Sequence, residues 1–524
     1  MRKQTVKWLL WIAFGALLTA VPLIFPQIGF LSWFGMIPLV YGATCICKRL
    51  ECTRRAAFGS GFIAGYVFYF AVFHWLIYLY PMDAVGLSKG ASIGVIAAGW
   101  LGIPALYGIL SGILFLFFRA VHKTGIFEKI PLLRPFVFAA LWTGYEWLTS
   151  QTWMGVPWGR LALGQIEMRP MLWISSVFGS FAVTFLIVVV NALLAEIAYT
   201  PKKTVVCGVL AAALFVGNLG CGLIWLNREI PTEKTFRAAV LQGNIGVAEK
   251  WDADGDSDFK TYVKLTENAA KDGAQLIVWP ETAFLYPNNS IWEKLTALSR
   301  NANADLIVGA LYRDAQGNDY NALYFIDHEK GLTEPVYLKR HLVPFGEYVP
   351  LRSFFEKLFP PLADLSFLED LSAGKSTALF DSEQGKIGSL ICFDSIYDQL
   401  AGESARDGAE LLVISSNDSW FYDSAAVYQH NAQAQLRAVE TGKWVLRAAN
   451  TGISSVITPQ GGVVDELPPL TYGYLVQTVG TVSDQTVYSR IGNTFVYLCL
   501  AFSVGVLVAG WIVKRKRKVT DISE

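Results

Sequence analysis

Long apolar runs constrain the fold of this chain more than any other feature of its sequence. A helix needs about 20 apolar residues to cross the hydrocarbon core of a bilayer. Eight runs meet that need, namely Trp8–Phe25, Phe30–Cys47, Ala56–Tyr80, Ser92–Phe118, Leu132–Leu148, Met171–Tyr199, Thr204–Trp225 and Thr494–Val513. The hydrophobic share of 53% and the mean hydropathy of +0.38 are typical of a membrane protein. We therefore predict an α-helical membrane bundle of eight spans.

Basic residues predict the orientation of these spans. They gather in five clusters that share one side of the membrane when all eight runs cross it: Arg2 to Lys7, Lys48 to Arg55, Arg119 to Arg134, Lys202 with Lys203, and Lys514 to Lys518. Because Lys and Arg are retained on the cytoplasmic side, the polar stretch between the seventh and eighth runs is expected outside. A signal peptide is the weaker interpretation of the first run, since no clear small-residue cleavage site follows it.

The polar stretch changes to short strand-like runs that alternate with helical ones from Phe236 onward, which predicts an α/β domain. Strands are expected at Phe236–Gln242, Ala274–Trp279, Asp305–Leu311, Asn321–Ile326, Val336–Lys339, Lys386–Cys392, Glu410–Ser415, Trp444–Ala449, Ser454–Thr458 and Tyr474–Val479. Helices are expected at Phe259–Lys271, Ile291–Asn301, Tyr397–Asp407 and Tyr428–Thr441. The predicted organisation is a membrane domain of seven spans over residues 1–229, an extracytoplasmic domain over 230–485, and an eighth span with a basic cytoplasmic tail over 486–524.

Charge and cysteine content narrow the function classes. The chain carries 43 basic and 43 acidic residues, so its net charge of zero offers no electrostatic case for nucleic-acid binding. Of the seven cysteines, only Cys392 lies in the polar stretch. A single cysteine excludes a disulfide within that domain. Because the sequence has no CxxC motif and no His/Cys ligand pair, we predict no metal site and no cofactor. A free thiol on the oxidising side therefore needs a functional reason.

Three residues at predicted strand ends can supply covalent chemistry. Cys392 ends an apolar strand, Glu281 follows Trp279-Pro280, and Lys339 ends another strand. A cysteine attacks as the thiolate, so it needs a base that accepts its proton, and Glu281 is suited to that task. Lys339 can stabilise the negative oxygen that forms when the thiolate attacks a carbonyl. Together these residues predict an acyl-thioester intermediate.

Each of these residues also has a plainer interpretation. A lone Cys in an apolar strand is more often a small buried hydrophobe, Glu281 can cap a following helix, and Lys339 can lie on a solvated face. His341 and His430 offer a Cys–His alternative. That alternative is disfavoured because no Asn or Asp is spaced to orient either ring.

The order of the motifs favours the catalytic interpretation. Trp279-Pro280-Glu281 comes first, then Leu338-Lys339-Arg340-His341 with Pro344-Phe345-Gly346-Glu347-Tyr348-Val349-Pro350, then Ile391-Cys392-Phe393-Asp394. This order resembles the nitrilase superfamily, and the combination with eight spans resembles its apolipoprotein N-acyltransferase family over essentially the whole chain. The resemblance extends to Gln242-Gly243-Asn244-Ile245, Lys250-Trp251, Ser416-Asn417-Asp418, Gln429-His430 and Arg447 through Ile453.

The resemblance implies a role for each site residue. Glu281 is expected to be the general base, Lys339 the oxyanion stabiliser and Cys392 the acylated nucleophile. Glu347 is expected to position Lys339 or the attacking amine. Four further positions match the family's substrate-binding site, namely Trp251, Asn321, Phe393 and Asp394. Family members often have Tyr-Glu where this chain has Phe393-Asp394, so substrate positioning is expected to differ there.

The resemblance also implies a fold and a reaction. The outer domain is expected to be a nitrilase-like α-β-β-α sandwich. The enzyme is expected to be a monomer in the bacterial inner membrane that moves an acyl chain from a phospholipid donor, through a Cys thioester, to the α-amine of a diacylglyceryl apolipoprotein. Aromatic segments at Trp153–Trp158 and Phe354–Leu365 suit a lipid-facing mouth, or interfacial anchoring. The alternatives are a membrane-tethered amidase of nitrilase type and a transporter or receptor with an outer binding domain.

Overall fold

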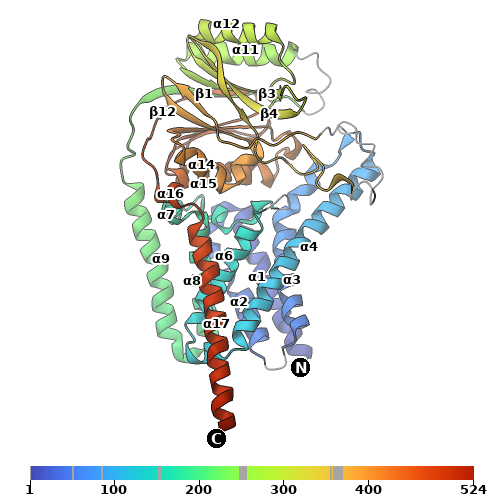
Figure 1. The fold of residues 1–524 in the computed structure, drawn as a ribbon, viewed down its shortest axis with the longest axis vertical. Helices are drawn as coiled ribbons and strands as arrows, with labels where there is room; N and C mark the ends of the chain where they lie inside the picture. Colours follow the sequence, from blue (N-terminus) through green and yellow to red (C-terminus); the bar gives the residue numbers. More distant parts are fainter. Residues whose placement is uncertain are drawn as a thin grey trace. The chain divides into compact units, whose positions relative to one another are not determined.

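The structure is a computed structural model that describes residues 2–49, 52–83, 86–151, 155–246, 256–353, 357 and 370–523 (Figure 1). The chain divides into two compact units. The first, here called the membrane unit, contains Met1–Ile77, Ile93–Arg228 and Ile491–Glu524. The second, the sandwich unit, contains Tyr78–Ser92 and Glu229–Arg490. The segment Tyr78–Ser92 thus groups with the sandwich unit, although it lies among the apolar runs in the sequence.

Long apolar helices build the membrane unit. They are α1 (Arg2–Ile24), α2 (Ile37–Lys48), α3 (Arg54–Val72), α4 (Lys89–His122), α6 (Leu133–Leu148), α8 (Ser180–Tyr199), α9 (Thr204–Leu226) and α17 (Thr494–Ser523). Among the described residues, seven helical segments are long and apolar enough to cross a membrane. The remaining predicted span corresponds to α6, which has 16 residues and is therefore short for a crossing. The count of eight spans stays a prediction.

One predicted span is interrupted in the structure. The sequence predicts a continuous segment over Met171–Tyr199, but the chain forms the short helix α7 (Ser175–Phe178) and then turns before α8. Gly179 occupies the break with φ 77° and ψ 168°, a conformation that only glycine adopts without strain. The membrane helix consequently begins at Ser180, and the prediction of one continuous segment was wrong.

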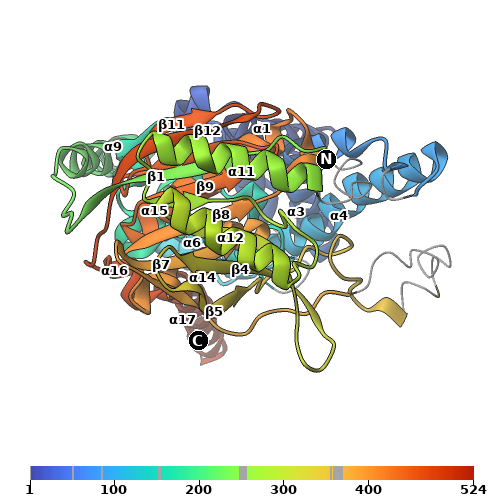
Figure 2. The same cartoon turned by 90° about the horizontal axis from the view of Figure 1, so that it is seen from above.

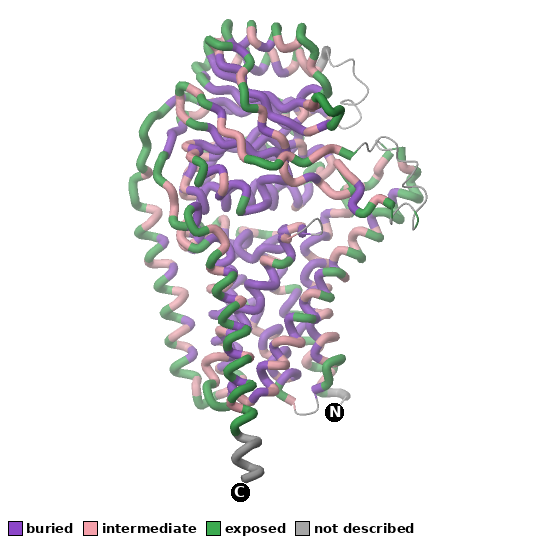
Figure 3. Tube along the Cα trace, viewed as in Figure 1, coloured by how far each residue is buried: buried purple, intermediate pink, exposed green. Residues whose placement is uncertain are grey.

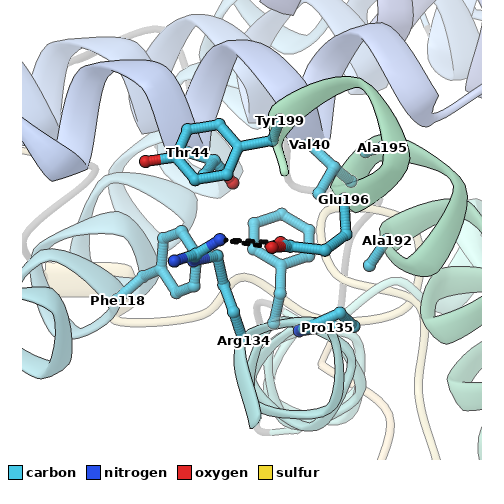
Figure 4. Close-up of a pocket in the computed structure, with 10 residues that line it drawn as sticks. Val40, Thr44, Phe118, Arg134, Pro135, Ala192, Ala195, Glu196 and Tyr199 are labelled. Atoms are coloured by element: carbon cyan, nitrogen blue, oxygen red, sulfur yellow. Dashed lines mark hydrogen bonds and ion pairs between the residues drawn. The ribbon is translucent and has the colours of Figure 1, made fainter. Parts of the chain in front are cut away.

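Two buried carboxylates of the membrane unit, Glu146 and Glu196, have hydrogen-bond partners within the helical bundle. Figure 4 shows a small cavity in which Arg134 points at Glu196, and its Nη1 lies 2.8 and 2.7 Å from the two carboxylate oxygens. Glu146 accepts a hydrogen bond from Thr184 Oγ1 at 2.8 Å. The ion pair gives Glu196 a structural role, since a buried charge persists when it is paired. Both contacts account for these carboxylates without a transport pathway.

Two six-stranded sheets build the sandwich unit. The first contains β1 (Thr235–Gln242), β2 (Leu276–Val278), β3 (Asp305–Arg313), β4 (Asp319–Asp327), β5 (Gly331–Leu338) and β12 (Gly473–Gly480), in the order β12-β1-β2-β3-β4-β5. The second contains β6 (Leu379–Ser382), β7 (Gly385–Ile391), β8 (Leu411–Ser416), β9 (Val445–Ala449), β10 (Ser454–Ile457) and β11 (Val463–Leu467), in the order β11-β10-β9-β8-β7-β6. The central pairs are parallel and the outer pairs antiparallel in both sheets.

Helices cover the outer face of each sheet. Figures 1 and 2 show α11 (Asp256–Lys271) and α12 (Asn289–Ala302) side by side on one face, and Figure 1 shows α14 (Asp398–Arg406) and α15 (Ala425–Thr441) on the other. Along β1, Ala238 and Val240 enter the core between the sheets, while Ala239 and Leu241 pack toward the helices. Buried positions accordingly follow the strands in Figure 3. The predicted α-β-β-α sandwich is confirmed.

The sequence predicts the ten other strands but misses β6 and β11. Both lie at the edges of the second sheet. β6 has only four residues, and β11 carries two adjacent acidic residues, Asp465 and Glu466, among its five. Short, charged edge strands prevent unwanted pairing with other chains, and the same features hide them from pattern recognition.

Candidate active site

Three strand ends bring the predicted triad together. Glu281 follows β2 by three residues, Lys339 follows β5 directly, and Cys392 follows β7 directly. The first two residues therefore come from one sheet and the third from the other. The site lies at an edge of the core between the sheets, and Cys392 is itself part of that core.

Lys339 joins two carboxylates in a buried ion-pair network. Its Nζ lies 2.9 Å from Oε1 of Glu281 and 2.8 Å from Oε1 of Glu347. The Lys339 side chain is 1% exposed, so these contacts replace its hydration. Burial alone would lower the pKa of Lys339, but Glu281 and Glu347 raise it well above its usual value. The ammonium group is thus charged at neutral pH.

Asn321 holds the two carboxylates beside the ammonium group. Its Nδ2 donates to Oε1 of Glu281 at 2.7 Å and to Oε1 of Glu347 at 3.1 Å. Because Asn321 lies on β4, a rigid strand sets the separation between the carboxylates. A second support comes from Gly309 on β3, where a Cβ atom would lie 2.4 Å from the carbonyl oxygen of Pro280. Only glycine lets β3 approach the Glu281 segment so closely.

Strained backbone marks both halves of the site. Cys392 has φ 47° at the start of a short 3₁₀ turn, Cys392–Ile396, and Thr282 has φ 48° directly after Glu281. A positive φ is uncommon for any residue with a side chain, and it is a genuine outlier for a β-branched one such as Thr282. Such strain concentrates at functional sites, where the surrounding structure maintains it.

Cys392 is a thiol in this resting structure. Burial and Glu281 raise the pKa of Cys392 well above its usual value, although Lys339 and Ser416 act in the opposite direction. A thiol in this state does not ionise by itself at neutral pH. Attack on a carbonyl therefore needs a base, and the Glu281 carboxylate is near enough to raise the thiol pKa.

Asp394 fixes the turn that carries the nucleophile. It is fully buried and accepts hydrogen bonds from the Tyr337 hydroxyl at 2.8 Å and from the backbone N–H of His341 at 2.7 Å and Ile391 at 3.1 Å. Burial raises the pKa of Asp394 to about 6, against the opposing effects of Lys339 and these donors. These contacts indicate that Asp394 positions the turn. The expected contact between Asp394 and substrate stays a prediction.

The remaining predicted positions divide into described and undescribed residues. Phe393 is 8% exposed and lies edge-on to Tyr397, with ring centroids 5.6 Å apart. Trp251 and the aromatic segment Phe354–Leu365, apart from Lys357, lie outside the described residues. Residues 153 and 154 of the Trp153–Trp158 segment also lie outside them, whereas Trp158 is buried in the membrane unit.

The plainer interpretations of Glu281 and Lys339 do not agree with the structure. The helix after Glu281 is capped by Asn288, whose side chain accepts from the backbone N–H of Ile291, so Glu281 is no helix cap. Lys339 is buried rather than solvated. His341 lies on Tyr397, and burial together with Lys339 lowers its pKa to about 4, which makes it a weak base. Cys392 is a buried residue, as the hydrophobic interpretation requires, but it is also next to charged groups.

The prediction that no carboxylate orients His430 was wrong. Its Nδ1 lies 2.9 Å from Oδ1 of Asp418, and Asp418 also pairs with Arg447 at 2.7 Å. Asp418 follows β8 and His430 lies on α15, so the contact depends on how this helix packs rather than on spacing in the sequence. A ligand atom from each of Cys392, Asp418 and His430 lies within 4.8 Å of the others. Arg447 already neutralises Asp418, which disfavours a metal ion at this cluster.

Comparison with known proteins identifies the family. Residues 237–484 match the carbon-nitrogen hydrolase family, and residues 14–193 match the apolipoprotein N-acyltransferase N-terminal domain. An apolipoprotein N-acyltransferase from Gloeobacter violaceus is 32% identical over 503 residues, which covers 94% of this chain and 92% of the relative. The chain belongs to the apolipoprotein N-acyltransferase family. This result confirms the resemblance predicted from the sequence.

Other apolipoprotein N-acyltransferases show the same extent of similarity. One from Geobacter metallireducens is 29% identical over 513 residues, covering 94% of this chain and 93% of the relative. Among solved structures, Saccharomyces cerevisiae Nit3, a member of branch 10 of the nitrilase superfamily, is 19% identical and gives a TM-score of 0.39. That match covers 51% of this chain and 97% of Nit3. Membership in the acyltransferase family confirms that the chain is an enzyme.

Proposed function

We propose that this protein transfers an acyl chain from a membrane phospholipid to the α-amine of a diacylglyceryl-cysteine at the N-terminus of an apolipoprotein. The single observation that best supports this proposal is the buried Glu281–Lys339–Glu347 network beside a thiol held at positive φ. Family membership and seven apolar helices indicate a protein of the bacterial inner membrane. An enzyme in the membrane avoids drawing an acyl chain into water, which costs about 0.8 kcal/mol for each CH₂ group.

In the first half of the proposed reaction, Glu281 takes the proton from the Cys392 thiol as Sγ attacks the ester carbonyl carbon of the phospholipid. The Lys339 ammonium group stabilises the negative oxygen of the tetrahedral intermediate. The bond to the lysophospholipid oxygen breaks, and Glu281 returns the proton to that oxygen. The products are a thioester on Cys392 and a lysophospholipid.

In the second half, the α-amine of the acceptor attacks the thioester carbonyl carbon. Glu281 takes a proton from the amine, and Lys339 again stabilises the tetrahedral oxygen. The carbon–sulfur bond breaks, the proton goes to Cys392 Sγ, and an amide is released. Glu281 is a carboxylate before each half, so the same base serves both.

Mass spectrometry of the protein after incubation with phospholipid tests the covalent step. We expect an acyl group on Cys392 that hydroxylamine removes, and we expect none in Cys392→Ala or in Glu281→Gln. Cys499→Ala is the matched control, because it removes another buried cysteine, from the membrane unit, and should leave the thioester in place. An acyl group on another residue, or transfer activity in Cys392→Ala, would disprove the mechanism.

The molecule that accepts the acyl group distinguishes this proposal from the membrane-tethered amidase. With a diacylglyceryl-cysteine peptide present, the acyltransferase produces an N-acylated peptide and consumes the thioester. A hydrolase passes the acyl group of its substrate to water at the same rate with or without the peptide. Hydrolysis of a small amide, with no N-acylated peptide formed, would favour the amidase.

We further propose that the sandwich unit lies on the extracytoplasmic side, and that the enzyme acts as a monomer. The five basic clusters support this orientation. A membrane-impermeant thiol reagent is expected to label a cysteine placed at Asn318 in intact cells but not one placed at Ser523, with the parent protein as background. The reverse labelling would put the site in the cytoplasm. Size-exclusion chromatography with light scattering measures the oligomeric state.

A further inference from the structure

A buried polar network behind the nucleophile is not used by the Glu281–Lys339–Cys392 mechanism. Its members are Asp418, His430 and Arg447, whose exposed fractions are 0, 1 and 0%. Arg447 Nη2 donates to Oδ2 of Asp418 at 2.7 Å, and Oδ1 of the same carboxylate lies 2.9 Å from Nδ1 of His430. Burying three polar side chains is costly unless each has partners. A network of this kind has a structural or a functional purpose.

The network reaches the peptide group of the nucleophile. Nε2 of His430 lies 3.2 Å from the carbonyl oxygen of Cys392 and 3.1 Å from Oγ of Ser395. Ser395 Oγ also donates to the Cys392 carbonyl at 2.7 Å. Ser395 has a single hydroxyl proton, which it gives to the Cys392 carbonyl, so Nε2 of His430 does not accept from Ser395 in that arrangement. The imidazole ring lies against both the carbonyl and the hydroxyl, and so limits where the carbonyl can move.

The surrounding chain is shaped to hold the carboxylate. Burial alone would raise the pKa of Asp418, but Arg447 and His430 lower it well below its usual value, so it is a carboxylate at neutral pH. A Cβ atom on Gly452 would lie 2.1 Å from Oδ2 of Asp418, which shows how closely the backbone packs against this oxygen. Ser416 donates to Oδ1 at 2.9 Å. Arg447, Gly452 and Ser416 therefore hold the Asp418 carboxylate, which in turn holds Nδ1 of His430.

We propose that His430, held by Asp418 and Arg447, is a positioning residue for the acyl transfer: it fixes the Cys392 carbonyl and so maintains the positive-φ turn that directs the thiol at the ester carbonyl. This inference rests on the proposed function. Cys392 has φ 47°, and without support this conformation relaxes toward the ordinary negative-φ regions. A displacement of the sulfur by about 1 Å is enough to slow a positioned reaction about 100-fold.

The test compares variants of the full-length enzyme in mixed micelles with phospholipid. His430→Ala is expected to lower kcat for thioester formation by roughly 10- to 100-fold while the KM for phospholipid stays within about twofold, since the turn and not the lipid site changes. His430→Gln places an amide near the Nε2 position and is expected to recover part of the rate. Equal rates in the Ala and Gln variants, or a wild-type rate in His430→Ala, would overturn the proposal.

A second histidine–aspartate pair provides the matched control. Nδ1 of His328 lies 2.7 Å from Oδ1 of Asp305, as close as the His430 pair, but no triad residue takes part in that contact. His328→Ala should therefore acylate at the wild-type rate. A loss equal to that of His430→Ala would show that any broken pair in this unit slows the enzyme, and the proposal would fail.

Two further measurements keep the test decisive. The rate at which iodoacetamide alkylates Cys392, followed on its peptide by mass spectrometry, reports on the thiol without any acyl donor, and it should fall in His430→Ala. If that variant does not fold, Ser395→Ala replaces it, with an expected loss of about threefold or more, and an unchanged rate would overturn the proposal. Absence of a thioester in the wild type, with normal alkylation, would instead contradict the proposed function.

Discussion

Replacing Lys339 by methionine is expected to lower both the stability of the sandwich unit and the rate of acyl transfer. Lys339→Met removes the ammonium group that lies 2.9 Å from Glu281 and 2.8 Å from Glu347, and leaves two carboxylates buried without a counter-charge. Removing one partner of a buried ion pair costs about 3–5 kcal/mol of folding free energy. For a unit of this size, that corresponds to a fall in Tm of roughly 6–20 °C.

Lys339→Met should also lower the rate of thioester formation, independently of its effect on stability. Loss of one oxyanion donor lowers the rate by about 100- to 1000-fold, or about 2.7–4 kcal/mol. Because the pKa of Lys339 is raised in the folded protein, its contribution to stability is fully present below the pKa of an unfolded lysine and is lost only as pH rises through the folded value. A comparison at pH 7 therefore measures the whole contribution.

The assay is thermal unfolding of the purified enzyme, combined with mass spectrometry of the Cys392 thioester. Lys330→Met is the matched control, because Lys330 lies 2.9 Å from Asp327 but is 68% exposed, and a solvent-screened pair of this kind contributes little to stability. Adding Glu281→Gln and Glu347→Gln to Lys339→Met removes the uncompensated charges and should restore part of the Tm without restoring the thioester. Equal Tm values for the Lys339 and Lys330 variants, or a normal thioester in Lys339→Met, would refute this reasoning.

Two further predictions concern the residues that position the triad. With a pKa of about 6, Asp394 gains a proton as pH falls through 6 and loses a hydrogen-bond acceptor, so the rate of thioester formation should decline in that range. Asp394→Asn should form the thioester slowly, with a flat pH–rate profile over the same range. A decline that persists in Asp394→Asn would contradict this assignment. An acid whose pKa is raised by folding binds its proton more tightly in the folded state, so this group stabilises the fold on acidification and cannot cause the decline by unfolding. Gly309→Ala should displace the Glu281 segment and reduce both Tm and thioester formation. Gly217→Ala on α9 is the control, because a Cβ atom there meets nothing within 4 Å, and it should leave thioester formation unchanged. Equal effects of the two substitutions would exclude the steric explanation.

The sequence alone determined the features that depend on local pattern. Apolar runs predicted the membrane helices because a bilayer requires about 20 consecutive apolar residues, whatever the neighbouring elements are. Short strand-like runs between helical ones predicted every described strand of the sandwich except β6 and β11, because each run depends on its own residues. The family resemblance then supplied the roles of Glu281, Lys339 and Cys392, which no local pattern contains.

Only the tertiary structure decided which of these side chains meet. Lys339 and Glu281 are 58 residues apart, and Asp418 and Arg447 are 29 apart, so neither spacing predicts contact. The absence of an orienting carboxylate for His430 was predicted wrongly for this reason, because a helix and a strand end from different parts of the chain supply the pair. The break at Gly179 likewise depends on a backbone conformation that hydropathy does not report. The hydropathy of a segment describes how that segment meets water or lipid. The chemistry at Cys392 depends instead on contacts between segments, and the packing of the two sheets and their helices sets those contacts.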